Sequence, residues 1–222
     1  MTGSRHLTSR QLDLSSVTDL VVGAGFVVRV QLGKAERATI WMDDNLADLV
    51  DATVTDGRLR LGLKPNVNVR NATLAAEITV RNLDQLTASG ASQVTLAPEL
   101  TADALGLEAS GASHITGRLR VEAVVAAASG ASMLALSGYV GHLTLHATGT
   151  SELQLSELAA RHLDVVLSGA SCAAVAVSDT LAAQTSGASV LRYSGAPRIT
   201  REQTSGASSI APEASRGDRC GP

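Results

Sequence analysis

Apolar and polar positions alternate along residues 83–212 in a pattern that returns about every twentieth residue. The tetrapeptide SGAS stands at residues 89, 110, 129, 168, 186 and 205, and the variant TGTS stands at 148, so successive copies are 21, 19, 19, 20, 18 and 19 residues apart. The fifth residue after each first position is always apolar: Val94, Ile115, Leu134, Leu153, Ala173, Leu191 and Ile210. The residue just before it is mixed: Gln93, His114, Met133, Glu152, Cys172, Val190 and Ser209. This alternation of period two predicts strands with one buried and one exposed face.

The seven copies predict a repeat fold in which each copy adds one coil. A period near 20 residues is too short for a helical hairpin repeat and is typical of one coil of a β-solenoid. Nearly equal coils place the residues of one column above one another, with backbones about 4.8 Å apart. We therefore predict an all-β protein, a single-chain parallel β-helix or β-solenoid with about seven coils of about 19–20 residues in residues 83–212.

The tetrapeptide itself is predicted to be a structural device rather than a repeated ligand site. Its glycines suit a corner where the backbone needs a positive φ or where a side chain would collide with the next coil. Its second serines share the parity of the apolar columns, so we expect buried hydroxyls that each donate to the serine of the next coil. The glycines are Gly90, Gly111, Gly130, Gly149, Gly169, Gly187 and Gly206. The serines are Ser92, Ser113, Ser132, Ser151, Ser171, Ser189 and Ser208.

The two ends of the chain lack the repeat. Residues 11–82 contain strand-like runs such as LVVGAGFVVRVQL and DGRLRLGL, which predict a β-rich N-terminal cap continuous with the solenoid. The segment MDDNLADLVDA within it predicts a short helix or a turn. Residues 1–10 and the polar tail 213–222 are expected to be disordered.

Composition narrows the possible partners. A net charge of −3 and a pI near 5.9 provide no basic field for nucleic acid. Residues 1–20 contain no apolar stretch of the signal-peptide type, and no later run has the length of a membrane span. We expect a chain without a signal segment, without a direct membrane span and without nucleic acid as a partner.

One group of side chains contains residue types that bind metal ions. His142 and His162 lie six residues before their tetrapeptides, so the register places them in one outward column on adjacent coils, with Asp164 facing the same way. These types of side chain bind Zn²⁺ and other divalent cations. The alternative, which we take as the expectation, is a solvated polar face that holds no metal.

Catalytic and cofactor motifs are otherwise missing from the sequence. The repeated serines have no base at a fixed spacing, which a serine nucleophile would need. Neither of the glycine-rich nucleotide motifs is present. We predict no catalytic residues, no cofactor and no enzymatic activity.

The run VVGAGFVVRVQLG, then DDNL and DGRLRLGLK, then the serial SGAS coils and the closing RYSGAPRITREQTSGASSI together resemble the bacterial DUF2807 family. This family is described as putative auto-transporter adhesin, head GIN domain. The resemblance covers about residues 11–211. It implies an extracytoplasmic β-helical domain, secreted or on the cell surface, and it brings no catalytic residues.

Three hypotheses for function follow. The first is a non-enzymatic surface module whose rigid solenoid binds an unknown surface polymer or protein. The second is a polysaccharide-active enzyme on a β-helix, which would need convergent carboxylates on one face. The third is a self-associating scaffold, a homo-oligomer paired through its open strand edges.

Overall fold

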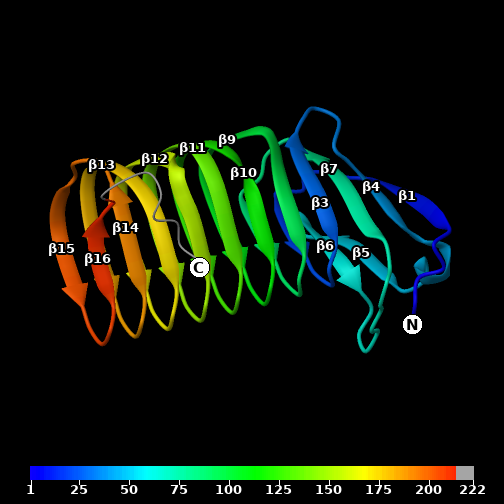
Figure 1. Cartoon of the computed structure of the whole chain (residues 1–222). Coiled ribbons are helices and arrows are strands. Elements are labelled where there is room, and N and C mark those ends of the chain that lie inside the picture. The colour runs from blue at the N-terminus through cyan, green and yellow to red at the C-terminus, as the bar shows by residue number, and fades with distance from the viewer. Residues whose placement is uncertain (214–222) are drawn as a thin grey trace.

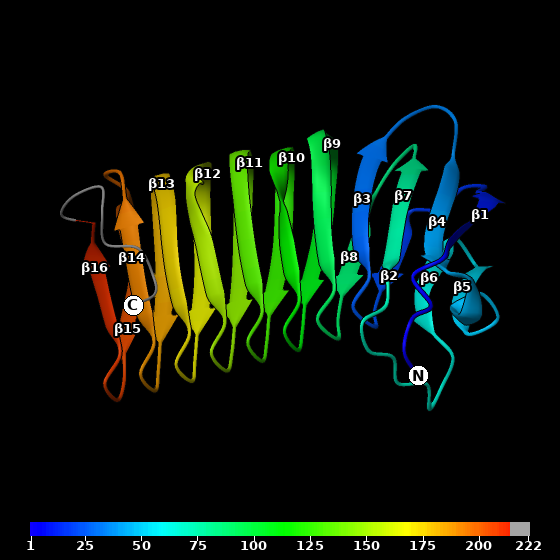
Figure 2. The ribbon, with the colours of Figure 1, turned by 45° about the vertical axis from the view of Figure 1, so that its right-hand side comes forward.

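Residues 1–213 are described by the computed structural model. Within them sixteen strands form a β-solenoid whose coils pair in parallel and whose N-terminal end contains antiparallel strands (Figure 1). The predicted fold class is confirmed. Five long strands each carry most of one coil: β9 (Gln93–Ala109), β10 (His114–Ala128), β11 (Met133–Ala147), β12 (Glu152–Leu167) and β13 (Cys172–Thr185). Each pairs in parallel with the next, and the tetrapeptides form the turns between them. Figure 2 shows these coils stacked side by side along one axis.

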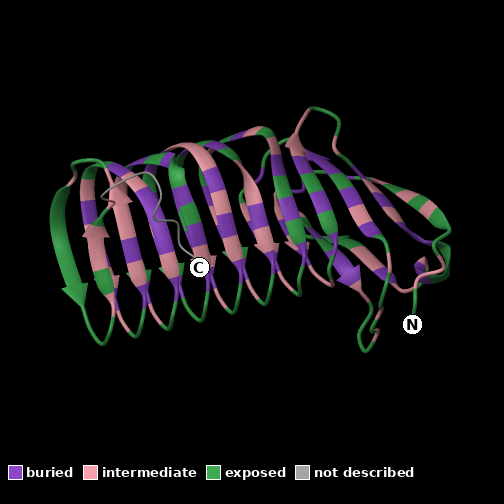
Figure 3. Cartoon of the chain, viewed as in Figure 1, coloured by how far each residue is buried: buried purple, intermediate pink, exposed green. Residues whose placement is uncertain are grey.

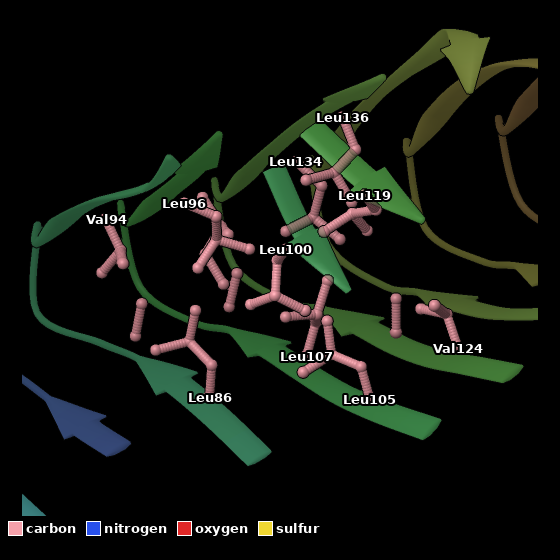
Figure 4. Packing of buried hydrophobic residues seen from close by; sticks show 14 of the residues in the cluster. Leu86, Val94, Leu96, Leu100, Leu105, Leu107, Leu119, Val124, Leu134 and Leu136 are labelled. Carbon is pink, nitrogen blue, oxygen red and sulfur yellow. The ribbon is translucent and has the colours of Figure 1, made fainter. Parts of the chain in front are cut away.

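The core lies between two layers of strand, because each long strand bends and contributes to both layers. Val94 and Leu96 come from the first part of β9, and Leu105 and Leu107 come from its last part. All four are at most 2% exposed, and Figure 4 shows them in the space between the layers. Figure 3 shows the resulting alternation of buried and exposed residues along each strand. The period-two pattern in the sequence is this alternation.

The inward column at the turns agrees with the sequence pattern. Leu134, Leu153 and Ala173 pair in register on adjacent coils and are at most 1% exposed. Their predecessors on the outer surface, among them Met133 and Glu152, are only partly buried. Because the alternation of buried and exposed residues keeps the same phase from coil to coil, the inward side chains form one continuous apolar core.

Six of the seven second serines are buried, as expected, and Ser208 is partly buried, but the hydroxyls are bonded differently from the prediction. Six of the seven donate to the carbonyl three residues earlier in the same turn, at 2.7–2.9 Å. Ser113 also donates to Ala88 O of the neighbouring coil, at 2.9 Å. Only Ser171 and Ser189 bring two of these hydroxyls together within the described residues, at 3.4 Å. The expected hydroxyl ladder is wrong, because a carbonyl of the same turn lies closer than the serine of a coil about 4.8 Å away.

The N-terminal part already contains coil geometry. The strands β2 (Asp19–Val22) and β3 (Val27–Leu32) pair in parallel with β8 (Gln85–Ala88) and β9. Antiparallel strands then close both layers. In one layer β4 (Arg37–Asp43) pairs with β7 (Leu74–Val80), and in the other β5 (Val50–Thr55) pairs with β6 (Arg58–Leu63). The predicted short helix is a single 3₁₀ turn, Asp44–Leu46, whose Leu46 is fully buried.

The prediction that residues 1–10 are disordered is wrong, because residues 7–10 belong to a strand that pairs with the sheet. The strand β1 (Leu7–Asp13) pairs antiparallel with β4, and the buried Asp43 carboxylate accepts hydrogen bonds from Arg5 N at 2.9 Å and Thr73 N at 2.8 Å. The burial of β1 alternates only between exposed and half-buried, so its sequence carries no apolar face. Backbone pairing and one buried carboxylate, rather than a hydrophobic pattern, hold this edge strand.

At the other end the solenoid finishes in three short strands, β14 (Val190–Ser194), β15 (Arg198–Thr204) and β16 (Ser209–Pro212). Every residue of β15 is exposed. Its residue Ile199 aligns with the buried Leu181 but is itself 42% exposed. The tail expected to be disordered, residues 213–222, lies outside the described residues except for Glu213.

Candidate functional site

A groove of about 530 Å³ crosses the outer surface of one layer, where five consecutive coils bend toward the other layer. It runs across the strands and therefore along the solenoid axis. Its lining residues are Leu96 and Pro98 from β9, Gly117 and Arg118 from β10, Ala135, Leu136 and Ser137 from β11, Gln154, Ser156 and Glu157 from β12, Ala174 from β13, and Glu213.

The groove is shaped by unequal coil lengths. On β9, three residues stand between Leu96 and Leu100, whereas their partners on β10 are separated by one residue. On β12, three residues follow Leu155 before Ala159, and the partners of these two on β13 are adjacent. Extra residues in a parallel ladder bulge from it, because they have no partner on the shorter strand, although Glu157 stays paired with Ser137 on β11. Pro98, Ser156 and Glu157 belong to these bulges, are exposed and line the groove.

Sequence reasoning missed these residues, although one signal was present. The two coils whose bulges line the groove correspond to the longest intervals between tetrapeptides, 21 and 20 residues, and β13 corresponds to the shortest, 18 residues. Deviation from the period therefore marks the coils that shape the groove.

The groove carries more negative than positive charge. Arg118 is neutralised by Glu99, with Nε and Oε1 at 2.9 Å, and Arg120 approaches the other oxygen of Glu99 at 3.8 Å. Within residues 1–213, Glu157 and Glu213 have no ion-pair partner. Anionic groups are therefore repelled from this surface and cationic or neutral groups are not.

The outer face of the other layer holds the predicted metal candidates. His142 and His162 pair in register, and their rings stack with centroids 4.5 Å apart and planes 22° apart. Asp164 is exposed and pairs with Thr144, two residues along from His142. The prediction of one shared outward face therefore agrees with the observed register.

The geometry of these side chains does not suit a metal ion. Imidazole lone pairs lie in the ring planes, so two nearly parallel stacked rings do not aim at one point about 2 Å from both nitrogens. His162 Nδ1 is also engaged with Thr180 Oγ1 at 2.8 Å. No three His, Cys, Asp or Glu side chains in the described part of the chain are grouped so that they could hold a metal ion.

Next to the stacked rings lies an exposed ion pair, Arg161 to Asp179, at 3.4 Å. The pKa of Asp179 is lowered below its ordinary value, first by the hydrogen bond from Ser178 Oγ at 2.7 Å and then by Arg161. This side of the solenoid is thus a polar, solvated face.

The comparisons with known proteins agree with this architecture. The family DUF2807, described as putative auto-transporter adhesin, head GIN domain, matches residues 17–197. No curated protein matches the chain. Among residues 1–213 no helix has the length and apolar character that a membrane crossing requires.

Several crystal structures share the fold. That of a putative adhesin from Bacteroides fragilis is 19% identical, with a TM-score of 0.88, and the match covers 96% of this chain and 100% of that one. That of a putative adhesin from Parabacteroides merdae is 16% identical, with a TM-score of 0.76, covering 96% and 98%. That of a putative lipid binding protein from Parabacteroides distasonis is 16% identical, with a TM-score of 0.77, covering 96% and 99%.

Proposed function

The chain belongs to the DUF2807 family, and we propose that it is a non-enzymatic, extracytoplasmic module that binds a polymer or protein on a surface. The family and the neighbouring structures support an adhesin-like role. The extracytoplasmic location and the binding of a ligand are our own inference from that role.

The observation that carries the proposal is the groove across five coils. Its bulges are flanked on either side by paired residues of the same strands, so the binding surface is formed before a ligand arrives. A preorganised surface loses little conformational entropy on binding. The groove also extends across five coils, which suits an extended ligand.

The absence of enzymatic activity is supported by the histidines. In the described part of the chain, the hydrogen bond to Thr180 is the only one made by a histidine ring, so no Ser–His or His–carboxylate contact is assembled. Such contacts are what activate a nucleophile or orient a base.

Two measurements test the proposal. Treatment of intact cells with a protease should digest the protein while a cytosolic marker stays intact, because the module is exposed outside the membrane. The purified protein should also be retained on plates coated with cells, polysaccharides or matrix proteins. A chain protected together with the cytosolic marker, or uniform lack of retention, would contradict it.

A further inference from the structure

We propose that the groove binds one strand of a linear polysaccharide that has no anionic groups, with the strand lying along the solenoid axis. This inference rests on the proposed binding function and specifies its ligand. Four observations support it: the direction of the groove, the spacing of the coils that form it, the pairing of β10 and β11 with strands on both sides, and the excess of negative charge along the groove.

Direction and spacing come from the coils. The groove crosses five strands whose separation is about 4.8 Å, so its floor spans about 19 Å and advances by one coil at each step. This step is close to the length of one pyranose unit in an extended chain. Successive sugars can therefore each lie over one coil, where they meet different side chains.

A peptide strand suits the groove less well. Strands recruit peptides by pairing with free backbone groups at a sheet edge. The groove instead lies over the middle of the sheet, where β10 and β11 are paired on both sides. An extended peptide also advances about 3.3 Å per residue, which does not match the coil spacing.

The side chains of the groove suit hydroxyl groups. Ser137 and Ser156 can each donate and accept, and Gln154 has donors and an acceptor in one planar amide. One donor of Gln154 is directed to Glu152 Oε1 at 2.7 Å, which fixes the amide and leaves its carbonyl oxygen for a ligand. Pro98 adds an exposed apolar surface for the C–H face of a sugar.

Charge determines which polysaccharides are accepted. Glu157 and Glu213 line the groove without ion-pair partners in the described chain, whereas Arg118 is neutralised by Glu99. Uronate, sulfate or phosphate groups are therefore repelled, neutral sugars are accepted, and protonated amino sugars gain attraction.

The test is isothermal titration calorimetry with the full chain and four hexamers: cellohexaose, the glucosamine hexamer, the galacturonate hexamer and a lysine hexapeptide. We expect the glucosamine hexamer to bind most tightly, cellohexaose to bind, and the galacturonate hexamer not to bind. Galacturonate that binds as tightly as the others, or binding of the lysine peptide alone, overturns the inference.

Variants then locate the site. Gln154→Ala should weaken both sugars about tenfold, the effect of one lost hydrogen bond. The matched control, Gln184→Ala on the outer face of the other layer, should change neither. Glu157→Gln should weaken the glucosamine hexamer at least threefold and leave cellohexaose within twofold, while Glu108→Gln, on the other layer, should have no effect.

The outcomes separate this inference from the proposed function. If the protein is retained on cells or matrix proteins but Gln154→Ala and Glu157→Gln bind them like the unmodified chain, the groove assignment fails and the adhesin-like function stands. If no surface retains the protein, the proposed function itself fails.

Discussion

Replacing a turn glycine by alanine adds one methyl group and should destabilise the solenoid. The loss of stability should depend on how closely the neighbouring coil approaches that glycine. Gly149 has φ +74°, and a Cβ at this residue would lie 2.6 Å from Gly130 O. That oxygen also accepts the hydrogen bond of Thr150 N at 2.7 Å, so it cannot move away freely. Gly25 has φ +77°, yet a Cβ there would meet nothing within 4 Å. The two positions share the backbone strain and differ in the contact between coils.

The expected magnitudes follow from these two terms. A left-handed conformation costs an ordinary residue about 1–2 kcal/mol, and overpacking costs about 1–3 kcal/mol. Gly25→Ala should therefore lower the free energy of unfolding by about 1–2 kcal/mol and Gly149→Ala by about 2–5 kcal/mol. Gly111→Ala should fall between them, because its Cβ would lie 3.3 Å from Gly90 N.

Urea unfolding followed by far-ultraviolet circular dichroism measures all three variants. The urea concentration at the unfolding midpoint should decrease from Gly25→Ala to Gly111→Ala and again to Gly149→Ala. The dependence of the unfolding free energy on urea concentration should be similar in the three variants. Equal destabilisation at the three positions would refute the reasoning, because the close approach of successive turns would then contribute nothing. Glycine would be required at these corners for its φ alone.

Three further predictions concern the turns, the C-terminal edge and one carboxylate. Ser113→Ala should lower the free energy of unfolding by about 1–2 kcal/mol in the urea assay, because it removes a buried hydroxyl that bonds Ser110 O at 2.8 Å and Ala88 O at 2.9 Å; a loss below about 0.5 kcal/mol would contradict this role. Glu202 is exposed on β15 and aligned with the buried Ala183, so Glu202→Val should raise the mass measured by light scattering above that of the unmodified chain as the concentration rises; an unchanged mass would contradict this. Ser178→Ala should raise the pKa of Asp179 in an NMR titration of its carboxyl carbon, and an unchanged pKa would exclude the hydrogen bond as the main cause. Because the folded pKa of this group is below 3.8, its stabilising contribution is complete above pH 3.8 and is lost as the pH falls through the folded value.

The solenoid could be predicted because its physical requirement repeats. Leu153 must be buried for the same reason as Leu134 one coil earlier, and the phase of one strand fixes the phase of the next. Seven repetitions of one weak pattern are a strong signal. The edge strand β1 has no such support: its pairing depends on Asp43, which lies 30 residues beyond its last residue, and its own residues are at best half-buried.

The groove could not be predicted for the opposite reason, since it exists where the repetition fails. The intervals of 21 and 20 residues show that two coils contain extra residues, but an interval does not say where in the coil they leave the sheet. Their position is set by which residues of the flanking coils remain paired, such as Leu100 with Leu119. A perfectly periodic solenoid would present a uniform face with nothing to distinguish one ligand from another. Selectivity therefore has to come from the irregular coils, and Ser156 and Glu157 are placed by such an irregularity on β12.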